Sequence, residues 1–194
     1  MRALLLVLCV VIMAGCAKSA IWVSDPVISE FENNDTKISL RPIHSDYYDE
    51  EYPGHDAYNR FILTVENKTD KVIELNWNKT NFISDGMSQG GFMLPAILFV
   101  DKDQPRQSDV VFAKSVLKKD IYPSSLAEFG KGWYNAPVVV GETGAFITLN
   151  IDGKEYQNKL TSKLRIITHI RCGSSIKSED CLKNIEPIST TPPR

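Results

Sequence analysis

The stretch from residue 44 to residue 58 gathers the residue types in this chain that could carry chemistry. It holds two of the three histidines and five carboxylates, with four tyrosines among them. Imidazole nitrogens and carboxylate oxygens together could bind Zn²⁺, and carboxylates alone could bind Ca²⁺. One hypothesis is therefore a metal-assisted hydrolase that uses His44, Asp46, His55 and Asp56.

The spacing within this stretch matches no ligand motif. It lacks the D-x-D-x-D-G pattern of a calcium loop and the H-E-x-x-H pattern of a zinc helix. Charged runs usually stay solvated, so the favoured interpretation is an exposed acidic loop with the tyrosines packed at its base. Because tyrosine is enriched at interfaces, a partner-binding loop is the second interpretation. We therefore predict no resident metal and no cofactor.

Other signals for chemistry are weak. No serine lies in a G-x-S-x-G elbow, and His169 lies in an apolar run typical of a strand. Trp77 and Trp133 could line a carbohydrate or apolar ligand site, but the phase of Trp77 in its alternating run favours core packing. Lys+Arg 22 against Asp+Glu 24 leaves no basic stripe for nucleic acid. We predict a non-enzymatic protein without a nucleic-acid partner.

The first sixteen residues predict a secretion signal that ends at a cysteine. Arg2 supplies a positive start, and residues 3–13 form an apolar run too short to span a membrane. Small residues then lead directly into Cys16, in the order Ala-Gly-Cys. This arrangement resembles the lipobox of bacterial lipoproteins, although Met13 stands where that family most often has leucine.

The lipobox resemblance implies that residues 1–15 are a signal peptide and that Cys16 carries acyl chains. Each buried CH₂ contributes about 0.8 kcal/mol, so two or three chains anchor a protein where one does not. Ala17 stands where an aspartate would indicate inner-membrane retention, so the outer membrane is the expected destination in a Gram-negative source. The alternative is an ordinary cleaved signal with a chance cysteine.

Two cysteines near the C-terminus, Cys172 and Cys181, predict a disulfide. In an oxidising envelope, an isolated pair this close most simply forms a bond, and closing a loop of about ten residues contributes about 2–3 kcal/mol. A redox or metal pair is the alternative, but C-x-x-C spacing and an intervening histidine are both missing.

Two alternating runs predict a β-hairpin. In residues 60–66 every second side chain is apolar, and residues 72–78 repeat the pattern after a polar turn cluster at 67–70. The in-phase side chains are expected in the core: Phe61, Leu63, Val65, Ile73, Leu75 and Trp77.

A second hairpin is predicted over residues 144–164. Apolar side chains alternate over residues 145–151, and Asp152-Gly153 suits a type I′ turn, whose two central residues need φ > 0. Shorter runs predict strands at 36–43 and 110–112, a strand or a single helical turn at 115–122, and a brief helix at 124–129.

These runs give about seven to nine short strands, which is the pattern of an all-β antiparallel β-sandwich. Trp77, the pair Gly90-Gly91 and the step Gly132-Trp133 make residues 58–160 similar to small envelope lipoproteins with immunoglobulin-like domains. The expected organisation is a lipidated tether at 16–26, an immunoglobulin-like β-sandwich domain at 27–185 and a disordered tail at 186–194.

The sequence leads to one favoured function and two alternatives. The favoured one is a lipid-anchored protein of the cell envelope that holds a binding surface near the membrane and recruits another envelope protein. The alternatives are the metal-assisted hydrolase and a small-ligand carrier with an apolar pocket between two sheets. The fold class itself does not choose among them.

Overall fold

Antiparallel β-strands build the described part of the protein, which confirms the all-β class predicted from the alternating runs. The computed structural model describes residues 17–44, 57–95, 99–129 and 132–171. Within these ranges the helical segments are two 3₁₀ turns, η1 (Phe99–Asp101) and η2 (Ser124–Leu126), and no helix there is long and apolar enough to cross a membrane. The strands are β1 (Ala17–Asp25), β2 (Ser29–Glu32), β3 (Thr36–His44), β4 (Tyr58–Asn67), β5 (Ile73–Leu75), β6 (Asn81–Ser84), β7 (Met87–Ser88), β8 (Phe92–Met93), β9 (Asp109–Val111), β10 (Val116–Pro123), β11 (Ala127–Phe129), β12 (Trp133–Asn135), β13 (Gly141–Ile151) and β14 (Lys154–Arg171).

The chain divides into two compact units. The larger one, residues 22–47 and 56–165, is called the domain below. The smaller one comprises residues 1–21, 48–55 and 166–194, and the structure describes only strand residues of it, from the start of β1 and the end of β14.

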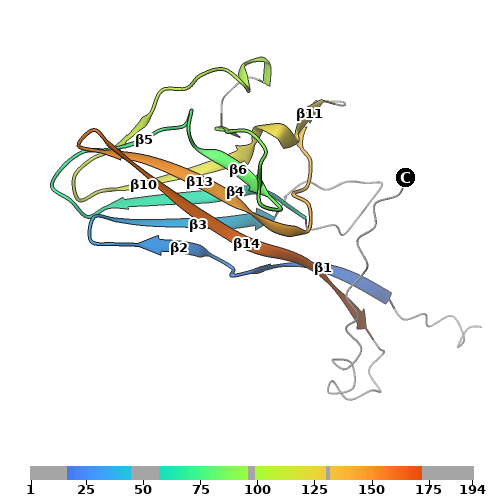
Figure 1. The fold of residues 1–194 in the computed structure, drawn as a ribbon. Helices are drawn as coiled ribbons and strands as arrows, with labels where there is room; N and C mark the ends of the chain where they lie inside the picture. The colour runs from blue at the N-terminus through green and yellow to red at the C-terminus, as the bar shows by residue number, and fades with distance from the viewer. Residues whose placement is uncertain (1–16, 45–56, 96–98, 130–131, 172–194) are drawn as a thin grey trace, which may run out of the picture. The chain divides into compact units, whose positions relative to one another are not determined.

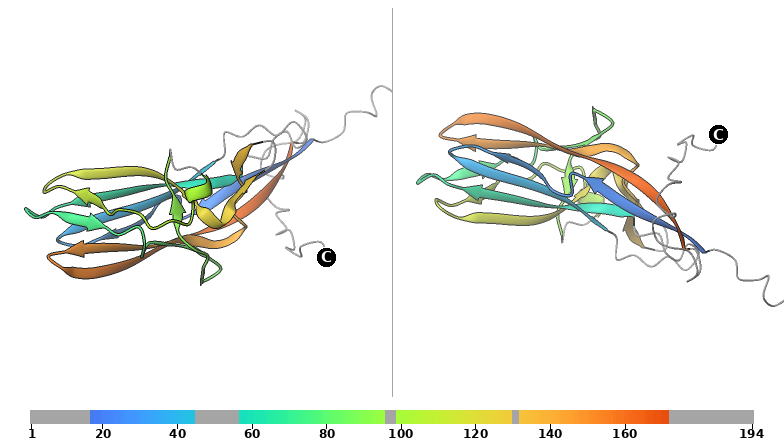
Figure 2. Two further views of the ribbon diagram at one scale, coloured as in Figure 1. Left: turned by 90° about the horizontal axis from the view of Figure 1, so that it is seen from above. Right: turned by 90° about the horizontal axis from the view of Figure 1, so that it is seen from below.

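Two antiparallel sheets pack face to face in the domain (Figure 1). One has seven strands in the order β1-β14-β13-β5-β9, with β6 paired to β13 and β7 paired to β6. The other has five strands in the order β2-β3-β4-β10-β8. Figure 2 shows the orange β13–β14 pair in one layer and the blue to teal strands β3 and β4 in the other. Strands β11 and β12 form a separate two-stranded ribbon.

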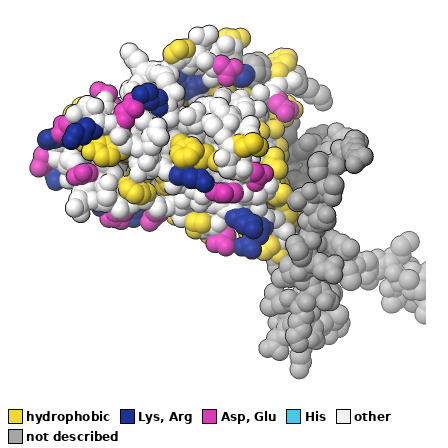
Figure 3. Space-filling view, viewed as in Figure 1, with side chains coloured by type: hydrophobic (Ala, Val, Ile, Leu, Met, Phe, Trp, Pro, Cys, Tyr) yellow, Lys and Arg dark blue, Asp and Glu magenta, His cyan; other side chains and the backbone are white. Residues whose placement is uncertain are grey.

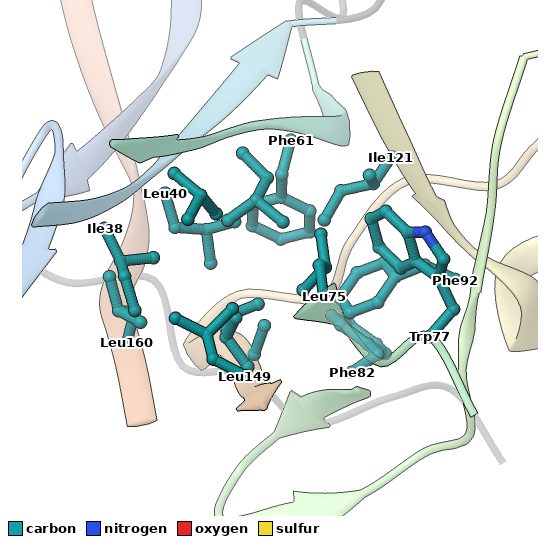
Figure 4. Packing of buried hydrophobic residues seen from close by; sticks show 14 of the residues in the cluster. Ile38, Leu40, Phe61, Leu75, Trp77, Phe82, Phe92, Ile121, Leu149 and Leu160 are labelled. Carbon is teal, nitrogen blue, oxygen red and sulfur yellow. The ribbon is translucent and has the colours of Figure 1, made fainter. Parts of the chain in front are cut away.

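The core lies between the two sheets and is filled by the side chains that alternate inward along the strands. At its centre, the rings of Phe61, Phe82 and Phe92 lie 6.1 to 6.3 Å apart between centroids, in tilted or edge-to-face pairs that aromatic rings favour. Figure 4 shows Trp77 beside Phe92 at the edge of this cluster. All six predicted core residues are buried: Phe61, Leu63, Val65, Ile73, Leu75 and Trp77.

The predicted hairpin of residues 60–66 with 72–78 is wrong. Strand β4 pairs with β3 along one edge and with β10 along the other, whereas β5 pairs with β13 and β9 in the opposite sheet. Period-two alternation marks a buried face on each strand, but two such faces can share one sheet or oppose each other across the core. Here they oppose each other, so the connection after β4 crosses from one sheet to the other.

The second predicted hairpin is confirmed. Strands β13 and β14 pair in unbroken register from Gly141↔Leu164 to Ile151↔Lys154. Asp152 and Gly153 form the two-residue turn with φ values of 52° and 74°, the positive values that a type I′ turn needs. The Asp-Gly pair thus adopts the backbone conformation that its residue types favour.

Other segments resolve or change the sequence expectations. Residues 17–25 of the expected tether form strand β1, because Trp22 packs against the core and lies edge-on to Tyr58 at 6.5 Å between ring centroids. The segment left open between strand and helix is strand β10, and the expected helix after it is the 3₁₀ turn η2 followed by β11. The described strands also outnumber the expected seven to nine, because several are only two or three residues long.

Candidate functional site

The metal-ligand hypothesis lies almost entirely outside the described residues. Asp46, His55 and Asp56 all fall there. His44 ends β3 half-buried, and its ring lies 4.1 Å from that of Tyr58 at an angle of 33°. Burial raises the pKa of the Tyr58 hydroxyl. Tyr58 is thus buried beside His44, whereas the other three tyrosines of the acidic stretch lie outside the described ranges. No three His, Cys, Asp or Glu residues in the described ranges gather as a metal site.

The lipidation and disulfide predictions also concern residues outside the described ranges, namely Cys16, Cys172 and Cys181. They remain predictions. Trp133 lies in β12 opposite Phe129 in the β11–β12 ribbon, and His169 lies in β14.

Trp77 is a core residue, as its phase in the sequence predicts. Its side chain is 4% exposed, and its indole Nε1 donates a hydrogen bond to Oδ2 of Asp109 at 3.0 Å. The same carboxylate oxygen lies 3.2 Å from the Nζ atom of Lys119, whose strand β10 belongs to the opposite sheet. Trp77 therefore contributes to a polar contact that links the two sheets at their edge.

A better candidate site is the end of the domain where four chain connections meet. We call it the tip surface and define it as residues 33–35, 68–72, 112–116 and 152–156. Backbone hydrogen bonds join three of these segments directly: Lys68 N donates to Asp35 O at 2.9 Å, and Lys114 N donates to Thr69 O at 3.2 Å. An ion pair between Lys71 and Asp152 joins the fourth. The tip surface is consequently built from segments that are distant in sequence and fixed to one another.

Asn67 holds the centre of this arrangement. The residue is 1% exposed, and its side-chain amide donates to the carbonyl oxygens of Lys71, Val111 and Phe112 at 2.7 to 3.0 Å. Its Oδ1 accepts hydrogen bonds from the backbone N–H and the hydroxyl of Thr69. One buried side chain thus fixes both the turn after β4 and the turn after β9.

The turn after β9 presents apolar side chains to solvent. Phe112 is 67% exposed and Val116 is 60% exposed, although the carbonyl of Phe112 is held by Asn67 and by Ser115. Val72 is also exposed and lies one position beyond the register pair Ile73↔Val111, so it neighbours Phe112 across the sheet. Val72 and Phe112 thus form an apolar group on a fixed backbone, whereas Val116 begins β10 in the opposite sheet.

A pocket of about 450 Å³ opens on the tip surface. Its charged residues are Lys68, Lys71, Lys114, Lys154, Asp35, Asp70 and Asp152, and Ile151 and Tyr156 supply apolar surface. Figure 3 shows lysines and carboxylates interspersed at this end of the domain, with apolar side chains among them.

Ion pairs within the chain neutralise most of these charges. Lys71 bonds to Asp152, Lys114 lies 3.4 Å from Asp70, and Lys68 bonds to Glu32. The hydrogen bond to Asp152 raises the pKa of the Lys71 ammonium, and the one from Lys68 lowers the pKa of the Glu32 carboxyl. The charges are nearly balanced, so the tip surface has the apolar groups and mixed polar rim of a binding surface rather than a strong field of one sign.

The sequence predicts the turns of the tip surface but does not predict that they meet. The polar cluster at 67–70 and the Asp-Gly turn both carry turn signals, whereas the hydrogen bond from Asn67 to the carbonyl of Phe112 joins residues 45 positions apart. The chain matches no known family model and no curated protein.

Proposed function

We propose that this chain is a lipid-anchored protein of the cell envelope whose β-sandwich binds another envelope protein through the tip surface. The observation that carries the proposal is the exposed apolar group of Phe112 and Val72 on a backbone fixed by Asn67. Contiguous exposed apolar side chains with a polar rim favour protein interfaces.

The balance of charge selects the kind of partner. The pocket of the tip surface is lined by four lysines and three aspartates, and Glu32 pairs with one of those lysines. An anionic lipid surface or a nucleic acid favours an uncompensated basic patch. A partner protein with an apolar contact and its own mixed charges suits the tip surface better.

The anchor and the subtype of fold belong to the same proposal. The lipobox-like sequence before Cys16 supports lipid attachment, with the outer membrane as the destination in a Gram-negative source. An immunoglobulin-like sandwich is supported by two antiparallel sheets with a connection that crosses between them after β4.

Two substitutions at equally exposed phenylalanines test the tip surface, each made in the full-length protein with Cys16 unchanged. Phe112→Ser removes the largest side chain of the apolar group, and Phe129→Ser removes an equally exposed phenylalanine in β11, at 68% against 67%. Crosslinking in isolated envelopes followed by purification should yield a stoichiometric partner with the wild type and with Phe129→Ser, but not with Phe112→Ser. Equal crosslinking of both variants, or none with the wild type, would contradict the proposal.

The anchor is tested separately. The wild-type protein should stay with membranes after a carbonate wash and show the added mass of acyl chains, whereas Cys16→Ser should be released. A Cys16→Ser protein that still sediments with membranes would contradict lipid anchoring. It would not bear on the proposed role of the tip surface.

A further inference from the structure

A second pocket, distinct from the tip surface, lies where the β5–β6 connection meets the loop after η1. It measures about 220 Å³. Its lining includes Trp77, Asn78 and Asn81 from one side and Gln104 and Arg106 from the other. No proposed role of the tip surface uses these residues.

The pocket wall is built by reciprocal hydrogen bonds. The side chain of Asn78 donates from Nδ2 to the carbonyl of Arg106 at 2.8 Å, and its Oδ1 accepts from the backbone N–H of Arg106 at 2.8 Å. This reciprocal pair of N–H···O bonds resembles the pairing between two β-strand residues and holds the loop against the β5–β6 connection. The loop is closed on itself as well, because Arg106 Nη2 donates to the carbonyl of Lys102 at 2.6 Å.

The Arg106 guanidinium is the charged group of this wall. It is half-buried, its Nε atom is covered and has no hydrogen-bond partner, and burial lowers its pKa. Asp103, the carboxylate whose charge acts on Arg106, is engaged at 2.6 Å by the ammonium of Lys102. The charged residues of the pocket lining are thus two cations and one anion, so the site carries a net positive charge.

The remaining lining suits hydroxyl groups. Asn81, Gln104 and Ser124 contribute amide and hydroxyl groups, which can both donate and accept hydrogen bonds. The indole of Trp77 is fixed by Asp109 and borders the same space. An aromatic border with side-chain amides is suited to a polyhydroxylated body, and the positive charge disfavours a ligand with its own ammonium group.

We propose that this pocket binds a small sugar acid, with its carboxylate held by the Arg106 guanidinium and its hydroxyl groups by the amide side chains. The volume is below the about 300–1,000 Å³ of sites for drug-sized ligands, so one monosaccharide unit is the appropriate size. Guanidinium is the side-chain group best matched to a carboxylate.

Titration with D-glucuronate tests the proposal, and D-glucose, acetate and inorganic phosphate serve as comparisons. Isothermal titration of the full chain should show glucuronate binding at least about tenfold more tightly than glucose or acetate, because charge and hydroxyl contacts are both required. Phosphate binding as tight as that of glucuronate would identify a general anion site and overturn the assignment. Equal binding of glucose and glucuronate would also overturn it.

A pair of variants assigns the effect to Arg106. Arg106→Gln should weaken glucuronate binding by about tenfold or more, whereas Arg41→Gln, which removes an exposed arginine of β3, should leave it unchanged. If Arg106→Gln unfolds, amide NMR of the wild type decides: glucuronate should shift the Trp77 indole and the Asn78 side-chain amide. Unchanged signals at both groups would overturn the proposal.

Discussion

The connection after β4 and the turn between β13 and β14 have similar signatures in the sequence but different structures. Each is a short polar cluster between two runs of alternating apolar residues. The β13–β14 turn joins neighbours in one sheet, whereas the connection over residues 67–72 joins strands of opposite sheets. Turn signals therefore identify where a strand ends but do not identify which sheet the chain enters next.

The β13–β14 turn and the connection after β4 are stabilised by different kinds of interaction. Asp152 and Gly153 adopt positive φ, which the residue types themselves favour, and the ladder on either side is continuous. The connection after β4 depends on Asn67, whose amide binds carbonyl groups 44 and 45 positions away in sequence. One region is specified locally and the other by long-range contacts.

The largest expected effect comes from a side chain inserted into the ladder of the hairpin. In Gly144→Ala the new Cβ would meet the carbonyl oxygen of Leu160 and lie 2.7 Å from the Cα of Thr161. Backbone atoms cannot move aside as a side chain does, so we expect unfolding free energy to fall by about 4 kcal/mol. Urea denaturation measures the change.

Gly132→Ala is the matched control, because a Cβ there meets nothing within 4 Å. Its unfolding free energy should change by less than about 0.5 kcal/mol. Similar losses in both variants would show that close approach of β13 and β14 at Gly144 is not what the hairpin requires.

The next largest effect tests the long-range connection. Asn67→Ala removes three donated and two accepted hydrogen bonds at a buried position, so we expect a loss of about 3 kcal/mol by denaturation. Asn33 is the control, since its Oδ1 accepts three bonds in an exposed turn. Asn33→Ala should cost about 1 kcal/mol. An equal cost at both positions would remove the distinction between the two kinds of connection.

The same distinction explains how much of the fold could be predicted from the sequence. Alternation correctly placed Phe61, Leu63 and Val65 in the core. A strand with one buried face shows a period-two pattern whichever strand it pairs with. The pairing of β4 with β10 spans a long stretch of chain, and no local pattern specifies it. Core membership was therefore predictable and strand order was not.

The candidate sites were less predictable for the same reason. Phe112 was expected only as part of a strand, but it lies just after β9 at an exposed position whose carbonyl group Asn67 binds. The sugar-acid pocket depends on Asn78 meeting Arg106, 28 positions along the chain. Sequence analysis pointed instead to residues 44–58, because their histidines and carboxylates lie close together along the chain.

A smaller effect is expected at the turn that local preference specifies. Gly153 has φ of 74°, so Gly153→Ala should cost about 1 kcal/mol of unfolding free energy through backbone strain. Asparagine tolerates this conformation better, so Gly153→Asn should cost less than half as much. An alanine variant as stable as the wild type would show that the ladder alone fixes this turn.

The smallest effect concerns an ion pair that joins the two regions, between Lys71 of the connection and Asp152 of the turn. The hydrogen bond from Lys71 to Asp152 raises the lysine pKa above its ordinary value of 10.5. A raised pKa in the folded state means that the pair stabilises the fold fully below that ordinary value and loses its contribution as the pH rises through the folded pKa. The pair is exposed, so its contribution at neutral pH is small and is screened by salt.

Thermal unfolding of the wild type and of Lys71→Met across alkaline pH measures this contribution. The wild type should have a slightly higher Tm at neutral pH and low salt, and the difference should vanish above the lysine pKa. Lys118→Met makes the same replacement at an exposed lysine of β10 and is the control for the substitution itself. The Tm difference between the wild type and Lys71→Met could instead persist unchanged at high pH. The stabilisation would then come from packing of the lysine stem, and the ion pair would not couple the two regions.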